Sequence, residues 1–599
     1  MKQKFIIIYS CLSLVFFFSC KKVSSFLEKA PGVDIDENTV FSSRVELDKY
    51  IATMYQFGLP SPLPLRTAEA GFTIAGNNTN TSGITDEAEA SESFSFTQNW
   101  NGGGINATNI IGNEDYRYSV RWQSIRIANI ILERIAEVPN LDPTYKEQVM
   151  GEALFIRAIN NFEMFKRYGG FPLVMKRITG LEEAKIARSP LEECIKAITK
   201  DCDEAVAKLP VVQPANFTGR ATQGAALALK TRTLLYAASP LFNTATPYLS
   251  FGGEDNKLIC YGNYDVARWK AAADAAKAVL DWAQAAGVTL IDVPAKRIPV
   301  ITPGGVVDGN YRTAWSQNDN SETILATKVF GGAKSVGAFP WLHVVTRSDY
   351  VANAGGFWVG TSPTFNFVRK YEKRDGTPQT WNPAGGNDLL TKYAELDPRF
   401  CQTVVYVGAR LHNNATRVQI WEGALSNKAT CKGGHWLLKW VPDAIGTTAQ
   451  IPYVPLFRLN EVYLSYAEAL NEANPGPTPE AYDAVNRVRN RSGMPNLPAG
   501  LSQAQFRDRV RNERDIELAF EDLRFNDIRR WMIAEQNGVM QGDFMGLEIT
   551  RLNTATPFPT AFSYKPYVFE PRVWERKQYL FPFDNNEVLK GNLKQNPGW

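Results

Sequence analysis

The hydrophobic residues of this chain recur at the 3.6-residue period of an amphipathic helix in several long segments. The clearest cases are residues 195–209, 266–280 and 459–470. After Ile195 the apolar positions are 198, 202, 205, 206 and 209, which share one face of a helix. The pattern therefore predicts at least three helices, each with one buried face.

Start signals predict five further helices. Several of them open with Asp-Pro, Thr-Pro or a Ser-x-x-Gln capping box; they cover residues 116–137, 143–168, 221–238, 479–491 and 502–520. The helix over 195–209 is similarly expected to begin at Ser189, with Pro190 as its first helical residue. Short connections and small residues favour antiparallel pairs of the tetratricopeptide type, although no strict 34-residue repeat is visible. We therefore predict a mostly α fold built on helix pairs.

The region between about residues 287 and 455 has a different pattern. It is rich in Gly, Asn and Pro, and its β-type runs are short, at 323–329 and 403–407. Aromatic residues outside any helical period stand among these loops, at positions 311, 315, 341, 350, 357, 358 and 381. Long loops in a compact chain are usually functional or disordered, and the aromatic content favours function. We predict a loop-rich, aromatic-rich ligand region with short strands.

The N-terminus carries an export signal. Lys2 and Lys4 precede 14 mostly apolar residues at 5–18, which is well short of the roughly 20 that span a bilayer as a helix. Ser19 and Cys20 follow directly, and this resembles the lipobox of bacterial lipoproteins. We expect residues 1–19 to be a lipoprotein signal peptide and Cys20 to carry acyl chains such as palmitate. The alternative is an ordinary signal peptide with an incidental cysteine.

Composition excludes several classes of protein. The 599 residues are 44% hydrophobic and 21% charged, which is typical of a globular protein, and loss of Lys2 and Lys4 lowers the formal charge from +3 to +1. A nucleic-acid partner is therefore not expected. Cys194 and Cys202 are too far apart along one predicted helix for a disulfide. The three histidines lack zinc-ligand spacing, so we predict no cofactor, and the sequence leaves a structural Ca²⁺ open.

The candidate chemistry is binding rather than catalysis. No Gly-x-Gly-x-x-Gly or Gly-x-Ser-x-Gly motif occurs. With 62 acidic residues, some pair of carboxylates is inevitable in any fold, so such a pair gives no evidence for a glycoside hydrolase. Aromatic planes beside Asn, Asp and Arg suit the C–H faces and hydroxyls of a glycan. The candidate ligand residues are Trp100, Asn101, Trp341 and Trp358. Loop anchoring is the alternative for these tryptophans, and packing is the better explanation for the helical Trp122, Trp269, Trp282 and Trp531.

Motifs along the whole mature chain resemble those of the SusD/RagB family of outer-membrane lipoproteins. They are GEALFIRA at 151–158, RYGGFPLV at 167–174, GRAT at 219–222, DPRF at 397–400, RLNEVYL at 458–464, NRVR at 486–489, LFPF at 580–583 and LKQNPGW at 593–599. These motifs are structural in character: Gly follows a helix end in the second, and Trp599 is expected to dock on the body. Glu513, Arg514, Glu517 and Glu521 have i, i+4 spacing for ion pairs on a helix face.

The resemblance implies a SusD-like fold with an N-terminal helical domain over 20–230 and a C-terminal domain with loop-rich insertions over 320–599. It also implies a non-enzymatic, lipid-anchored protein of the cell outer membrane. Such a protein binds an oligosaccharide or a peptide and passes it to a SusC-like, TonB-dependent transporter. The alternatives are a surface glycoside hydrolase and a peptide-binding or adhesive lipoprotein.

Overall fold

The computed structural model describes residues 37–60, 81–90, 96–111, 117–302, 306–327, 361–410, 417–424, 426–428, 431–441 and 453–599. The long helices are α3 (Arg44–Gly58), α5 (Tyr118–Arg134), α6 (Pro143–Tyr168), α7 (Leu191–Lys208), α8 (Gln223–Ala238), α9 (Ala267–Ala286), α15 (Leu459–Ala473), α16 (Pro479–Arg491) and α17 (Gln503–Glu517). The short helices are α2 (Glu37–Val40), α4 (Phe96–Asn101), α10 (Asn310–Ser316), α12 (Phe365–Val368), α13 (Leu389–Glu395), α14 (Phe400–Thr403), α18 (Arg524–Arg530) and α19 (Asn585–Leu589). Helices therefore dominate, as the sequence predicts.

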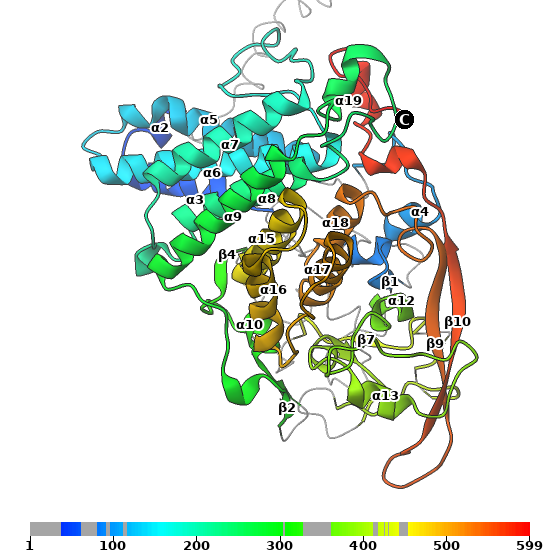
Figure 1. Cartoon of the computed structure of the whole chain (residues 1–599). Coiled ribbons are helices and arrows are strands. Elements are labelled where there is room, and N and C mark those ends of the chain that lie inside the picture. Colours follow the sequence, from blue (N-terminus) through cyan, green and yellow to red (C-terminus); the bar gives the residue numbers. More distant parts are fainter. Residues whose placement is uncertain are drawn as a thin grey trace, which may run out of the picture.

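The long helices pack in a continuous row. Each of α5 to α8 packs on the next helix in the chain, and α15 then packs on α8 and α9 and also contacts α16 and α17. Figure 1 shows α5 to α9 side by side across the upper part of the molecule, with α15 against α9 and α16 below α15. The C-terminal part of the chain thus continues the row that the N-terminal part begins. This arrangement confirms the mostly α fold.

Local signals set the ends of these helices. Asp142 accepts a hydrogen bond from the backbone N–H of Tyr145 at 2.8 Å, Pro143 begins α6, and Gly169 follows its end with a φ of 76°. A complete capping box of Ser502 and Gln505 starts α17. α7 differs from the prediction, because it begins at Leu191 with Pro190 as its N-cap and no side-chain cap. Cys194 and Cys202 are buried in α7 and free, as predicted.

The strands pair two by two in antiparallel fashion. The pairs are β1 (Ala88–Ala90) with β5 (Thr361–Pro363), β2 (Val300–Ile301) with β3 (Val307–Asp308), β4 (Thr323–Thr327) with β8 (Val454–Arg458), β6 (Val404–Val405) with β7 (Trp436–Leu437), and β9 (Gly542–Arg551) with β10 (Phe562–Arg572). β4 and β6 confirm the two β-type runs. The β9–β10 hairpin, which runs along one edge of the molecule in Figure 1, was not predicted.

The described part of the loop-rich region forms a core of its own. Tyr311 and Trp315 in α10 are fully buried, and the rings of Trp315 and Trp440 meet edge to face at 5.8 Å. Trp381 is partly buried, with its ring 5.1 Å from that of Phe365. These aromatic side chains therefore anchor the loops from within, which corrects the interpretation of positions 311 and 315 as part of a ligand region.

A buried ion-pair network joins this core to the helices. The carboxylate of Glu517 pairs with Arg399 at 2.9 Å and with Arg491, and it accepts a hydrogen bond from Asn460 at 2.7 Å. Glu513 pairs with Arg489 at 2.8 Å. The predicted pairing along one helix face is therefore wrong, since the partners come from distant segments. In a helix the i, i+4 positions share a face, and here the glutamates at 513, 517 and 521 are buried and pair with four arginines of other segments, Arg399, Arg458, Arg489 and Arg491.

We expect Gly224→Ala to lower the free energy of unfolding by about 1–2 kcal/mol, although alanine favours helices by up to about 1 kcal/mol. A Cβ atom at Gly224 would lie 2.2 Å from ring carbons of Trp282, so α8 and α9 would have to move apart. Gly476→Ala is the control, because its Cβ would meet no atom within 4 Å. Urea unfolding measures both variants, and equal stabilities would contradict the close approach of the two helices.

Candidate ligand-binding site

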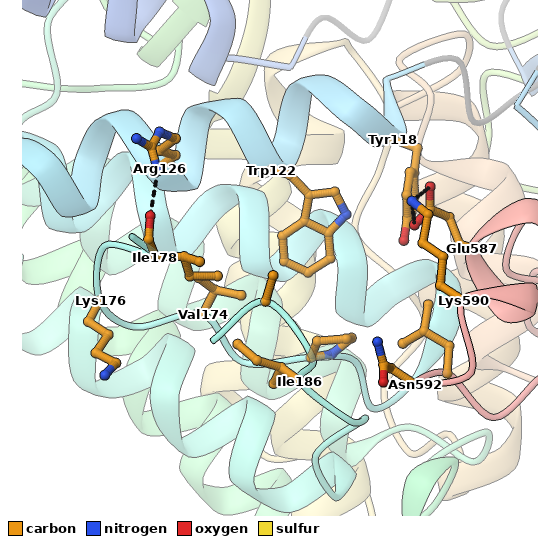
Figure 2. Close-up of a pocket in the computed structure, with 13 residues that line it drawn as sticks. Tyr118, Trp122, Arg126, Val174, Lys176, Ile178, Ile186, Glu587, Lys590 and Asn592 are labelled. Atoms are coloured by element: carbon orange, nitrogen blue, oxygen red, sulfur yellow. Dashed lines mark hydrogen bonds and ion pairs between the residues drawn. The ribbon is translucent and has the colours of Figure 1, made fainter. Parts of the chain in front are cut away.

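A cavity of about 370 Å³ opens beside α5, within the roughly 300–1,000 Å³ that small-molecule sites occupy. Its other walls are a strap, residues 172–186, and a C-terminal tail, residues 584–599. The lining residues are Tyr118, Trp122, Arg126, Pro172, Val174, Lys176, Ile178, Ala184, Ile186, Glu587, Lys590, Asn592 and Leu593. Figure 2 shows these side chains around the ring of Trp122. We refer to this site as the Trp122 cavity.

α5 places the aromatic wall. Tyr118, Trp122 and Arg126 are four residues apart and therefore lie on one face of the helix. The ring of Tyr118 meets that of Trp122 edge to face, with centroids 6.1 Å apart, and meets the ring of Tyr168 in the same way at 6.0 Å. Trp122 is partly exposed, whereas Tyr118 is buried. The buried ring of Tyr118 thus supports the indole of Trp122, which lines the cavity.

Buried side chains fix the course of the strap. Asn129 donates hydrogen bonds to the carbonyls of Val174 and Lys176, each at 3.0 Å. Arg157 donates to the carbonyl of Met175 at 3.1 Å and is paired with Asp201 at 2.7 Å. These donors belong to the helix row, so the core sets the conformation of this wall.

Arg188 ties the C-terminal tail to the residues that flank the strap. Its guanidinium donates to the carbonyl of Lys594 at 2.8 Å and to Oδ1 of Asn596 at 2.9 Å, and also to the carbonyls of Tyr168 and Gly170, each at 2.9 Å. Burial lowers the pKa of Arg188 to about 10, which leaves the side chain charged at neutral pH. The buried, charged guanidinium of Arg188 therefore positions the tail through hydrogen bonds to its oxygen atoms.

The end of the chain also docks on the body. Trp599 Nε1 donates to the carbonyls of Lys577 and Leu580, each at 3.0 Å. This contact confirms the docking predicted for Trp599.

The cavity has a polar side and an aliphatic side. Figure 2 shows Tyr118, Asn592 and the Glu587–Lys590 pair on one side of the Trp122 ring, and Val174 and Ile178 on the other side with Arg126 and Lys176 at its margin. Ile186 lies below the ring and adds to the aliphatic side. Lys590 and Glu587 are 2.8 Å apart. Within the described ranges, neither Trp122 Nε1 nor the Asn592 amide has a hydrogen-bond partner. An aromatic face with free donors beside it is suited to a ligand that combines C–H faces with polar groups.

The described residues hold no group of three or more His, Cys, Asp or Glu side chains that could bind a metal ion. Among the same residues, no helix is both long and apolar enough to cross a bilayer.

Two of the predicted ligand residues are core residues. Trp100 is 1% exposed in α4 and packs against Phe525 and Phe581, with ring centroids 5.5 and 5.2 Å away. Asn101 is buried and donates to the carbonyl of Gly83 at 3.1 Å. The exposed loop predicted for this pair is therefore wrong, because the segment folds into a helix whose indole fills the core.

The remaining predicted site residues, Trp341, Trp358 and Cys20, lie outside the described residues, so their roles stay predictions. The helical tryptophans at 269, 282 and 531 are buried, as predicted, but Trp122 faces the cavity. The sequence signal for Trp122 was its 118, 122, 126 spacing of Tyr, Trp and Arg on one helix face. Nothing local indicated the strap and the tail that complete the site.

Two family models match this chain. The model described as "SusD family" matches residues 321–599, and the one described as "Starch-binding associating with outer membrane" matches residues 25–235. SusD-like protein P2 of Formosa agariphila is 31% identical over 163 residues, and SusD-like protein P38 of the same organism is 35% identical over 86 residues. These alignments span 26% and 14% of this chain, and 27% and 16% of the respective relatives.

Solved structures match the fold over nearly the whole chain. A SusD-like protein of Bacteroides fragilis has a TM-score of 0.73 at 25% identity and covers 95% of this chain and 100% of that one. A SusD-like carbohydrate-binding protein of the same species has a TM-score of 0.64 at 19% identity, with coverages of 93% and 99%. Because matches to both halves of the sequence agree with the fold, this chain belongs to the SusD family.

Proposed function

We propose that this chain is a non-enzymatic lipoprotein that captures an oligosaccharide at the cell surface and delivers it to a SusC-like, TonB-dependent transporter in the outer membrane. Membership of the SusD family supports this role, and one matching family model is described as starch-binding and associated with the outer membrane. Acylation of Cys20 would anchor the chain to that membrane.

The observation that carries the proposal is the Trp122 cavity. A partly exposed indole offers a flat face for the C–H groups of a sugar ring, and its Nε1–H is free within the described residues to donate to a hydroxyl. The Asn592 amide and the Glu587–Lys590 pair supply further donors and acceptors at the same side. The strap and the tail are tied to the helix row by hydrogen bonds from Asn129, Arg157 and Arg188, which favours a preformed site.

The composition of the lining favours capture over hydrolysis. Glycoside hydrolases use two carboxyl groups set about 5–9.5 Å apart across the bond that is cut. Among the described residues that line the cavity, Glu587 is the single carboxylate, and it is paired with Lys590. This lining therefore supports binding of a saccharide without its hydrolysis.

The test is calorimetric titration of the soluble chain, starting after Cys20, with a panel of polysaccharides and peptides. We expect a saccharide to bind without release of product, and Trp122→Ala to weaken its binding at least tenfold because the stacking face is lost. Tyr264→Ala is the matched control, since this aromatic side chain is 61% exposed and lies outside the cavity lining. Trp341→Ala and Trp358→Ala test the predicted loops in the same assay.

Two results would contradict the proposal. Chromatographic detection of cleaved saccharide would identify a hydrolase, and binding confined to peptides would change the substrate class. If Trp122→Ala binds normally while Trp341→Ala or Trp358→Ala does not, the ligand site lies in the loops rather than in the Trp122 cavity.

A further inference from the structure

The aliphatic side of the Trp122 cavity is more apolar than a plain sugar requires. Val174, Ile178 and Ile186 line the cavity there, and Pro172, Ala184 and Leu593 are further apolar residues of the lining. Hydroxyl groups placed against these side chains would lose their hydrogen bonds to water without replacement, which opposes binding. An unsubstituted sugar ring could therefore satisfy only the polar side.

An acetyl group has both an apolar part and a polar part, which match the aliphatic side and the polar side of the cavity. Its methyl group gains from contact with aliphatic side chains, and its carbonyl oxygen accepts hydrogen bonds. The Nε1–H of Trp122 and the amide of Asn592 are donors without a partner among the described residues. A sugar stacked on the indole could direct its substituent between the two sides.

The charges around the cavity do not favour an acidic sugar instead. Lys590 is paired with Glu587 at 2.8 Å. Arg126 donates to the carbonyl of Ile178 at 2.8 Å and also faces Glu37 at 3.7 Å. Two of the three cations that line the cavity are thus already engaged, and the apolar wall remains the distinguishing feature.

From this combination we infer that the Trp122 cavity takes a sugar residue that carries an acetyl group, either as an acetamido sugar or as an O-acetyl ester. The inference rests on the proposed function, since it names the substrate class of the same site. The indole stacks on the sugar ring, the acetyl methyl packs against Ile186 and Val174, and the polar groups lie toward Asn592 and the Glu587–Lys590 pair.

The test compares triacetylchitotriose with cellotriose by calorimetry on the soluble chain that starts after Cys20. Both are β-1,4-linked trisaccharides, and they differ in having an acetamido group or a hydroxyl group at C2. A second pair is O-acetylated xylo-oligosaccharides before and after mild alkaline deacetylation. We expect the acetylated member of at least one pair to bind about tenfold more tightly, which corresponds to about 1.4 kcal/mol.

Variants locate this preference within the protein. Ile186→Ser places a hydroxyl on the aliphatic side and should reduce the preference to less than threefold. Leu181→Ser is the matched control, because Leu181 lies in the same strap but is 87% exposed and does not line the cavity. Equal thermal melting of both variants verifies that they are folded.

The outcomes separate this inference from the proposed function. Saccharide binding with no preference in either pair overturns the inference alone. The same holds if the preference survives unchanged in Ile186→Ser. If no member of either pair binds while another saccharide of the panel does, the acetyl inference also falls. If no saccharide binds at all, the proposed function falls with it.

Discussion

Replacement of Glu517 by alanine is expected to lower the free energy of unfolding by about 3–5 kcal/mol, because it breaks a buried ion-pair network from one side. Glu517 is fully buried, and its carboxylate is shared by Arg399 and Arg491. Without it, two guanidinium groups that are themselves fully buried lose a charged partner in a site that water does not reach. Urea unfolding followed by tryptophan fluorescence measures the loss.

Glu204→Ala is the control for this experiment. Glu204 pairs with Lys200 on the exposed surface of α7, where an ion pair contributes at most about 0.5 kcal/mol. A similar loss of stability in both variants would contradict the importance that we assign to the buried network.

The same carboxylate should make stability depend on pH. Burial alone would raise the pKa of Glu517, but the guanidinium groups of Arg491 and Arg399 outweigh burial and hold the pKa at about 2, below the ordinary 4.5. A depressed pKa contributes stability that is fully present above the unfolded-state value and is lost as pH falls toward the folded-state value. The contribution of Glu517 should therefore disappear between about pH 4.5 and pH 2. Urea unfolding of Glu517→Gln across that window should show a shallower dependence than the unsubstituted chain.

Replacement of Arg188 by alanine is expected to cost about 3 kcal/mol and to release the C-terminal tail. Hydrogen bonds to a charged group each contribute about 1.5–3 kcal/mol, and water can replace only some of the four that Arg188 donates. Hydrogen exchange should then be faster over residues 584–599. Because the tail supplies Asn592 and Leu593, saccharide binding in the Trp122 cavity should weaken in parallel.

Two other variants make this result specific. Arg188→Lys keeps the charge but not the planar donor fork, so an intermediate loss is expected. Lys594 lies in the same tail and forms a half-exposed ion pair with Asp255 of the body. Lys594→Ala removes that pair and should leave the hydrogen exchange of the tail unchanged. Undisturbed protection of the tail in Arg188→Ala would show that other contacts, such as those of Trp599, are sufficient to hold it.

Where a feature depends on neighbours in the chain, the sequence predicts it well. Pro143 and Gly169 mark the two ends of α6, and the capping residues of α17 lie within three positions of each other. Such signals act over one helical turn and do not need the rest of the fold. The helix row was predictable for this reason, and α7, α9 and α15 also show their buried face as a periodic pattern.

Features that depend on distant segments were predicted poorly. Glu517 was expected to pair within its own helix, yet Arg399 is 118 positions away. Trp100 and Trp122 have the same side chain but opposite environments, because Phe525 and Phe581 cover the first, whereas the strap and the tail leave the second open. No local pattern distinguishes the two, so the sequence did not show that Trp100 is covered and that Trp122 lines a cavity.

The packing of α15 on α8 and α9 has a consequence for the order of folding. Synthesis completes α9 at residue 286, but the helix that covers its flank ends only at residue 473. Contacts across such a separation form late, because a long loop must close first. A nascent chain would therefore carry an uncovered apolar flank while nearly two hundred further residues are made. Because exposed apolar surface promotes aggregation, we expect chaperones to bind that flank during the delay.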